Sequence, residues 1–346
     1  MKLQKSHAVW NRAYRREAFT LIELLIVMSI ITLLAALVAG ATILYIGRQR
    51  ESNTKATIAK VFGELDWQWR SVVDDAKTEY KTLSGNVLTA LNSMATPPGG
   101  ALDAERAQVI WIKCRLRQQF PMNFTEITTA VTMQGPSGPV TMLPTVPAYA
   151  NALGNTAQTS NPPNAAESGA ALLIALTTQT RHGRSTSRDL FGSQAILDTN
   201  ADGVPELVDG WGQPLAYWRW PVANPELDAL NPNNTGSTPR AFQDPCDQQG
   251  RLLADNWNNY SNWSGSKGCQ QFEQNFHLIH GPLPPTTTTS GNYVAQSWYL
   301  IPVIASAGPD GKFGLQQVSA PSPDPMLIAN QPQANDNIYS YNVMPR

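Results

Sequence analysis

The sequence predicts an α+β protein in which one long N-terminal helix packs on a small antiparallel sheet with long loops. Three observations support this prediction. The chain is apolar from Phe19 to Ile46, where Glu23 is the one side chain expected to carry a charge. Beyond residue 46, apolar residues recur at spacings of three and four, as on one face of a helix. After residue 189, short runs rich in aromatic residues alternate with turns, as strands do.

We divide the chain into five expected segments. A basic leader, 1–18, precedes a transmembrane helix, 19–46, which at about 1.5 Å per residue is long enough to cross a bilayer. An amphipathic helix continues over 47–96 and is followed by a helical and low-complexity region, 97–188. The remainder, 189–346, is expected to be rich in strands.

The distribution of charged residues predicts how the chain is oriented in the membrane. The leader carries five Lys or Arg residues and one Glu, a net of +4, which leaves −5 on the rest of the chain. Positive residues favour the cytoplasmic side, so we expect a single-pass inner-membrane protein whose later residues lie outside that membrane. Because no basic stripe follows the leader, nucleic acid is not an expected partner.

Further elements are expected along the chain. A helix over Asp103–Gln119 ends in a basic run that we expect to be solvated, a loop follows over 135–167, and a second helix covers Ser168–Thr178. Sequence patterns also indicate strands. The expected strands are Pro214–Trp220, Phe276–Ile279, Ser297–Ala305 and Ile338–Asn342.

Cysteine spacing leaves two alternatives open. In an oxidising compartment Cys246 and Cys269 could form a disulfide, with Cys114 unpaired. The same two cysteines could instead bind zinc with His277 and His280, although their spacing fits no compact zinc finger.

The strongest sequence signal spans residues 15–27. A basic leader ending in Ala18 is followed by Phe19-Thr-Leu-Ile-Glu23 and the apolar run Leu-Leu-Ile-Val. An unpaired carboxylate inside an apolar helix is costly, so Glu23 needs a partner. This pattern closely resembles the signal of type IV prepilins and type II secretion pseudopilins, except that Ala18 stands where the family usually has Gly.

The resemblance implies how the chain is processed and assembled. A prepilin peptidase in the membrane would cut before Phe19, and the new amine would be methylated. The amine of one subunit would then pair with Glu23 of another as an inner-membrane assembly platform builds a helical filament. A plain membrane anchor or an ordinary secretory signal is the alternative, but the apolar core of a secretory signal is only about 7–15 residues long.

An acidic loop predicts a metal site. Oxygen-bearing side chains occupy loop positions 1, 3, 5, 9 and 12, a glycine stands at position 6, and position 7 can offer a carbonyl. This is the ligand order of an EF-hand calcium loop. The ligand residues are Asp198, Asn200, Asp202, Val204, Glu206 and Asp209. We expect structural calcium here, although a turn that binds no metal would use the same residue types.

Two further stretches resemble type II secretion major pseudopilins. Residues 209–217 match an Asp-x-Trp-Gly-x-Pro-x-x-Tyr element, and residues 306–314 match a Ser-x-Gly-x-Asp-Gly-x-x-Gly loop. In that family the C-terminal loop can bind calcium, which makes Asp310 and Asp336 a second candidate site. A segment over 316–334 separates the two acids.

The sequence contains no catalytic motif. It lacks Gly-x-Ser-x-Gly, His-Glu-x-x-His and the glycine-rich phosphate loops, so an enzyme is not expected. The alternative function is a membrane-tethered module that binds calcium or carbohydrate. The long polar insertion 224–291, with Trp257 and Trp263 available for sugar stacking, favours that alternative.

Overall fold

The computed structural model describes part of the chain and divides it into two compact units. The units are Met1–Gln49 and Arg50–Arg346, and we call the second the head. The described residues are 19–156, 164–221, 226–227, 244–252, 268, 299–314, 316–317, 325–326 and 332–344.

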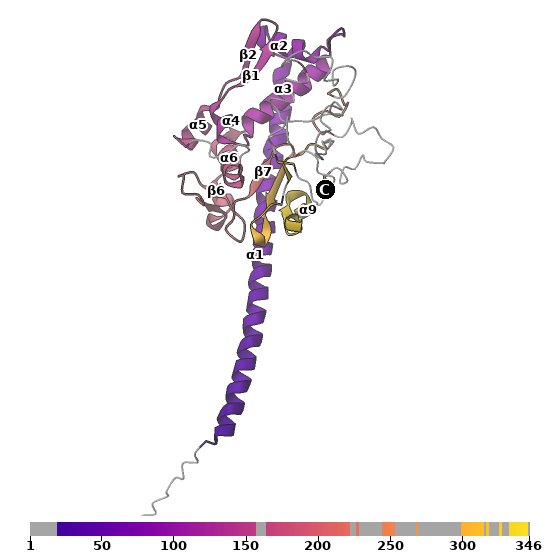
Figure 1. The fold of residues 1–346 in the computed structure, drawn as a ribbon. Coiled ribbons are helices and arrows are strands. Elements are labelled where there is room, and N and C mark those ends of the chain that lie inside the picture. The colour runs from indigo at the N-terminus through magenta and orange to yellow at the C-terminus, as the bar shows by residue number, and fades with distance from the viewer. Residues whose placement is uncertain are drawn as a thin grey trace, which may run out of the picture. The chain divides into compact units, whose positions relative to one another are not determined.

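Helix α1 runs without a break from Leu21 to Tyr80 (Figure 1). Its apolar residues from Leu21 to Ile46 are all exposed. A window of this helix has a mean hydropathy of 2.8, which makes it long and apolar enough to cross a membrane. The predicted apolar helix is therefore confirmed.

The part of α1 that belongs to the head buries one face. The predicted apolar stripe supplies most of that face, and Gly63 does not interrupt the helix. The buried apolar residues are Ile58, Val61, Phe62, Leu65, Trp69, Val72 and Ala76. The helix ends at Tyr80, however, and a separate helix α2, Gly85–Ala95, follows it, so 47–96 is not one helix. Gly85 has φ 64°, a left-handed conformation in which the chain turns between the two helices.

Helix α3, Ala104–Gln119, confirms the prediction for this region. Its N-cap is Asp103, whose carboxylate accepts the amides of Glu105 and Arg106. The basic run at its end is buried in part, in contrast to the prediction, and the side chains of Arg115 and Arg117 are only 20% and 16% exposed. Lys113 is fully buried and pairs with Asp244 at 2.5 Å. Arg115 pairs with Glu79 and Arg117 pairs with Glu126, so acids outside α3 neutralise this end of the helix.

The expected loop over 135–167 contains regular structure. Strands β1, Val131–Gly135, and β2, Gly138–Leu143, form an antiparallel hairpin. Two short helices flank it, α4, Phe124–Thr128, and α5, Pro147–Leu153. The turn Pro136-Ser137 between the strands carries the loop-like composition, while Val131, Met133, Met142 and Leu143 are buried in the core.

Helix α6, Ala165–Thr178, is buried along most of its length and lies beside the sheet (Figure 1). Its N-cap is Asn164 and its first residue is Ala165, three residues before the predicted start at Ser168. A side chain at Gly169 would place its Cβ 2.6 Å from the carbonyl oxygen of Leu215, so glycine permits the close approach.

The central sheet has three antiparallel strands in the order β11-β8-β7. They are Ile338–Tyr339, Val303–Ser306 and Ala216–Trp218, each shorter than its predicted run. Helix α9, Ser340–Val343, follows β11 where the sequence predicts continued strand. The predicted strand Phe276–Ile279 lies outside the described residues.

Short elements complete the described chain. Three strand pairs are β3–β4 (Thr180–Arg181, Arg184–Ser185), β5–β6 (Ile196–Leu197, Glu206–Leu207) and β9–β10 (Gln316–Gln317, Pro325–Met326). The 3₁₀ helices are η1 (Arg188–Leu190), η2 (Ser193–Ala195), η7 (Gly308–Asp310) and η8 (Pro332–Ala334).

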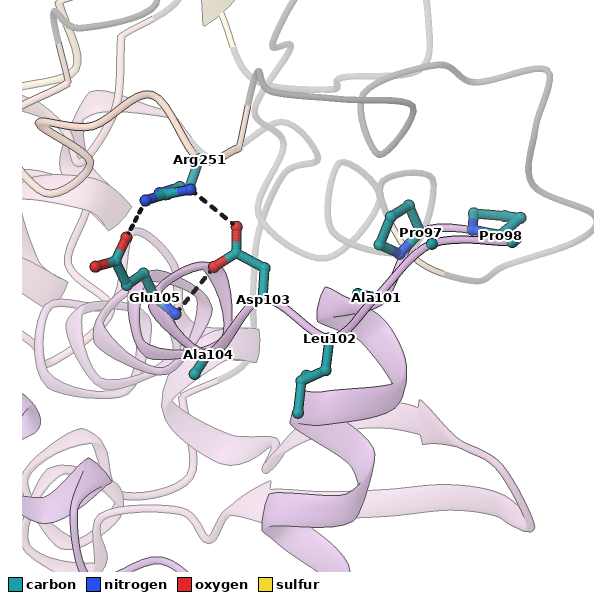
Figure 2. A pocket seen from close by; sticks show the side chains of 10 residues that line it. Pro97, Pro98, Ala101, Leu102, Asp103, Ala104, Glu105 and Arg251 are labelled. Atoms are coloured by element: carbon teal, nitrogen blue, oxygen red, sulfur yellow. Dashed lines mark hydrogen bonds and ion pairs between the residues drawn. The ribbon is translucent and has the colours of Figure 1, made fainter.

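One piece of the polar insertion 224–291 is anchored to α3. Figure 2 shows Arg251 reaching toward Asp103 and Glu105, beside a hollow lined by residues 97–105. Arg251 forms ion pairs with both acids, and its carbonyl accepts Nε of Arg106 at 2.8 Å. Together with the Lys113–Asp244 pair, these contacts hold residues 244–252 against helix α3 and its N-cap.

Candidate functional site

The N-terminal end of α1 is closed by a reciprocal pair of side chains. Oε2 of Glu23 accepts the backbone amide of Thr20 at 2.9 Å and its hydroxyl at 2.8 Å. In return, Oγ1 of Thr20 accepts the amide of Glu23 at 3.2 Å. This is a capping box, and its Thr-x-x-Glu spacing was present in the sequence. Thr20 was not predicted as a partner of Glu23, although this spacing indicates it.

The capping box satisfies only part of the Glu23 carboxylate. Both bonds from Thr20 reach Oε2, and Oε1 accepts none from the described residues. Phe19 precedes the helix and is exposed. The predicted cleavage point joins Phe19 to Ala18, and Ala18 lies outside the described residues.

The acidic loop connects strands β5 and β6. Its first acid, Asp198, accepts the amides of Asp202 at 3.2 Å and Gly203 at 3.0 Å. Asn200 accepts the Asp202 amide and donates to its carboxylate, which also accepts the amide of Val204. Ala201 and Gly203 have φ 57° and 88°, so the backbone turns sharply inside these side chains. Four of the predicted ligand residues are thereby gathered in one turn.

Three carboxylates converge at this loop. One oxygen from each of Asp198, Asp202 and Glu206 lies within 4.8 Å of the others. Glu206 is 0% exposed, and its Oε2 accepts the amide of Thr199 at 2.8 Å. Its Oε1 has no hydrogen-bond partner among the described residues. Burial raises the pKa of Glu206, and the negative charges of Asp202 and Asp198 add to that rise.

Asp209, predicted as the ligand at loop position 12, forms hydrogen bonds elsewhere. Its Oδ1 accepts the amides of Trp211 and Gln213, and its Oδ2 accepts the Ser306 hydroxyl. The acid is buried and is not one of the three converging carboxylates. Its carboxylate is bound by the turn that it begins and by strand β8, and its role as a calcium ligand stays a prediction.

The second candidate site brings two loops side by side. Strand pairing sets Ile338 opposite Ser306, so Asp336, two residues before β11, lies near the end of β8. A Cβ on Gly308 would lie 2.4 Å from the Asp336 carbonyl oxygen. Asp310 accepts the amide of Lys312 within its own turn. Calcium bound jointly by Asp310 and Asp336 stays a prediction.

The remaining predicted sites fall largely outside the described residues. Cys269 is one of them, so its disulfide with Cys246 stays a prediction, and Trp257 and Trp263 are two more. Cys114 is a free, buried cysteine, and burial raises the pKa of its thiol to about 12. A thiol with so high a pKa is a poor nucleophile at neutral pH, because the thiolate is the reactive form.

Comparison with known families identifies the N-terminal segment. Residues 14–39 match the family model described as the prokaryotic N-terminal methylation motif. The chain therefore carries a prepilin-type signal, consistent with a type IV pilin or pseudopilin-like protein. This signal implies processing by a prepilin peptidase and assembly with other pilin subunits, which are structural proteins. Searches among curated proteins and among solved structures returned no match for this chain.

Proposed function

We propose that this chain is a structural subunit of a type IV pilus-like filament or a type II secretion pseudopilus. The observation that carries the proposal is helix α1, which exposes a continuous apolar surface over Leu21–Ile46 and continues without a break into the folded head. A helix with that surface is stable in lipid or against other helices of the same kind. A filament core of bundled N-terminal helices provides such an environment after the subunit leaves the membrane.

Glu23 would set the register between subunits. The precursor would sit in the inner membrane with its basic leader in the cytoplasm and its head outside. Cleavage between Ala18 and Phe19 would create a positive amine, and that amine would pair with Glu23 of an adjacent subunit. A charge in the apolar core costs at least about 2.5 kcal/mol when it is unpaired, so pairing favours one register over others. The Oε1 atom that Thr20 leaves unbonded in the described chain can accept this amine.

The experiment combines processing with assembly in the host's own filament system. Mass spectrometry of the purified chain should find a methylated Phe19 at the N-terminus. Glu23→Gln keeps an oxygen acceptor for Thr20 but removes the charge, so it should be cut normally while its share in sheared filaments falls by about tenfold or more. Thr20→Val is the matched control, since it removes the hydroxyl and retains the charge; it should assemble.

Two results would contradict the proposal. A mature chain that still begins at Met1 in cells with an active peptidase would remove the amine on which pairing depends. Normal incorporation of Glu23→Gln would show that charge pairing does not set the register. Isolated membrane monomers that bind sugar through residues 224–291 would instead support the tethered binding module.

A further inference from the structure

The acidic turn between β5 and β6 contains a buried, incompletely bonded carboxylate. Glu206 belongs to strand β6 and is 0% exposed, whereas Asp198 is an exposed residue of the turn. Asp202 is partly exposed, and these two aspartates on a turn would by themselves need no cation. Glu206 differs because water does not reach it and its Oε1 has no partner among the described residues. A buried polar atom in that condition costs about 1–3 kcal/mol, and more when it is charged.

The charges around Glu206 make the arrangement more costly. Asp198 and Asp202 each place an oxygen within 4.8 Å of it, and both act on Glu206 as negative charges. Like charges this close disfavour one another unless a proton or a cation lies between them. The bond from the Thr199 amide neutralises only part of one carboxylate.

We propose that the turn binds a calcium ion between Asp198, Asp202 and Glu206. The ion would bond to the free Oε1 of Glu206 and to one oxygen of each aspartate. The Asn200 side chain and the carbonyl of Val204 follow the same turn and can complete the protein ligands. Calcium takes six to eight oxygen ligands in flexible geometry, so water would fill the remaining positions.

The contacts of Asp209 determine how tightly the acidic turn is expected to bind calcium. In an EF-hand loop the acid at position 12 contributes two oxygens, but the Asp209 carboxylate is bound to the following turn and to Ser306. A loop without that ligand should bind weakly, with a dissociation constant of about 10⁻⁴–10⁻³ M, as extracellular calcium modules do. Such a site would be filled outside the cell and would brace the β5–β6 hairpin that leads into the Asp209 turn.

The test uses the full chain in detergent micelles, first stripped of metal with a chelator. Calcium chloride titrated to millimolar concentration should raise the melting temperature and give a saturable calorimetric signal, and magnesium chloride should give less, because it prefers rigid octahedral sites. Glu206→Gln preserves the acceptor for Thr199 but removes the charge. This variant should melt no lower than wild type without metal and should lose calcium affinity by about tenfold or more.

Asp310→Asn is the matched control, because it alters the other candidate site and leaves the acidic turn unchanged. It should keep the wild-type response to calcium. The proposal is overturned if wild type shows no calcium response, or if Glu206→Gln retains it. A response that Asp310→Asn abolishes would also overturn it and would place the ion at the C-terminal loops. None of these outcomes depends on filament assembly, so the proposed function is tested separately.

Discussion

The carboxylate of Asp209 accepts the hydroxyl of Ser306 at 2.6 Å, which ties the turn before β7 to the end of β8. Both residues are buried, and the other oxygen of Asp209 accepts the amides of Trp211 and Gln213. Ser306 also accepts the amide of Gly308 at 3.0 Å. One acid therefore fixes two segments that are far apart in the sequence.

Removing this acid should destabilise the head. Asp209→Ala leaves buried donors without an acceptor, so we expect a loss of about 3 kcal/mol in the free energy of unfolding, and about 1 kcal/mol for Ser306→Ala. Urea unfolding of the full chain in micelles, followed by tryptophan fluorescence, measures both. Asp189→Ala is the control, because Asp189 is exposed and should change stability by less than about 0.5 kcal/mol. Equal losses for Asp189→Ala and Asp209→Ala would contradict the assigned role.

A second prediction concerns the close approach of the Asp209 turn to helix α1. A Cβ on Gly210 would lie 2.2 Å from the carbonyl oxygen of Arg50, and the Gly210 amide donates to Oγ1 of Thr54 at 2.8 Å. Gly210→Ala should therefore force the turn off the helix and cost about 1–3 kcal/mol.

Gly63→Ala is the matched substitution within the same helix. Gly63 is exposed, and a Cβ there would meet nothing within 4 Å. Alanine should stabilise the helix by about 0.5–1 kcal/mol, because glycine loses more backbone entropy on folding. Thermal melting of the two variants should thus move in opposite directions. A neutral Gly210→Ala would show that the turn does not touch α1.

A third prediction follows from Glu126, whose side chain is 6% exposed and bonds to Arg219 at 2.7 and 2.9 Å. Desolvation acts to raise the pKa of Glu126, but the charge and bonds of Arg219 and the charge of Arg117 outweigh it and lower the pKa to about 2. Because the folded pKa lies below the ordinary 4.5, the stabilisation is complete above that pH and is lost as the pH falls toward 2.

Unfolding free energies measured between pH 6 and pH 2.5 check this prediction. Wild type should lose up to about 3 kcal/mol through this group, while Glu126→Gln should show a shallower dependence on pH. Asp66→Asn removes a partly exposed partner of Arg70 and should follow the wild-type curve. If Glu126→Gln followed that curve as well, the buried pair would not be the source of the acid sensitivity.

Local sequence was sufficient for the apolar part of α1, for α3 and α6, and for the N-terminal signal. Apolar spacing along α1 and the N-cap Asp103 of α3 act within a few residues, so their pattern can be read without the fold. The Thr20–Glu23 capping box is equally local, and its spacing would have revealed it. The order Asp198-x-Asn200-x-Asp202 likewise predicted a turn whose side chains face one another.

Partners separated by long stretches of chain could not be predicted in this way. Spacing alone assigned Asp209 to the acidic loop, whereas its oxygens are bound by the turn after it and by Ser306. The sequence pattern predicted a solvated basic end for α3, whereas Lys113 is buried and pairs with Asp244. The sequence determined where charges and apolar faces lie along each element. Only the tertiary structure decided which charges lose water, because burial depends on segments that the fold brings together.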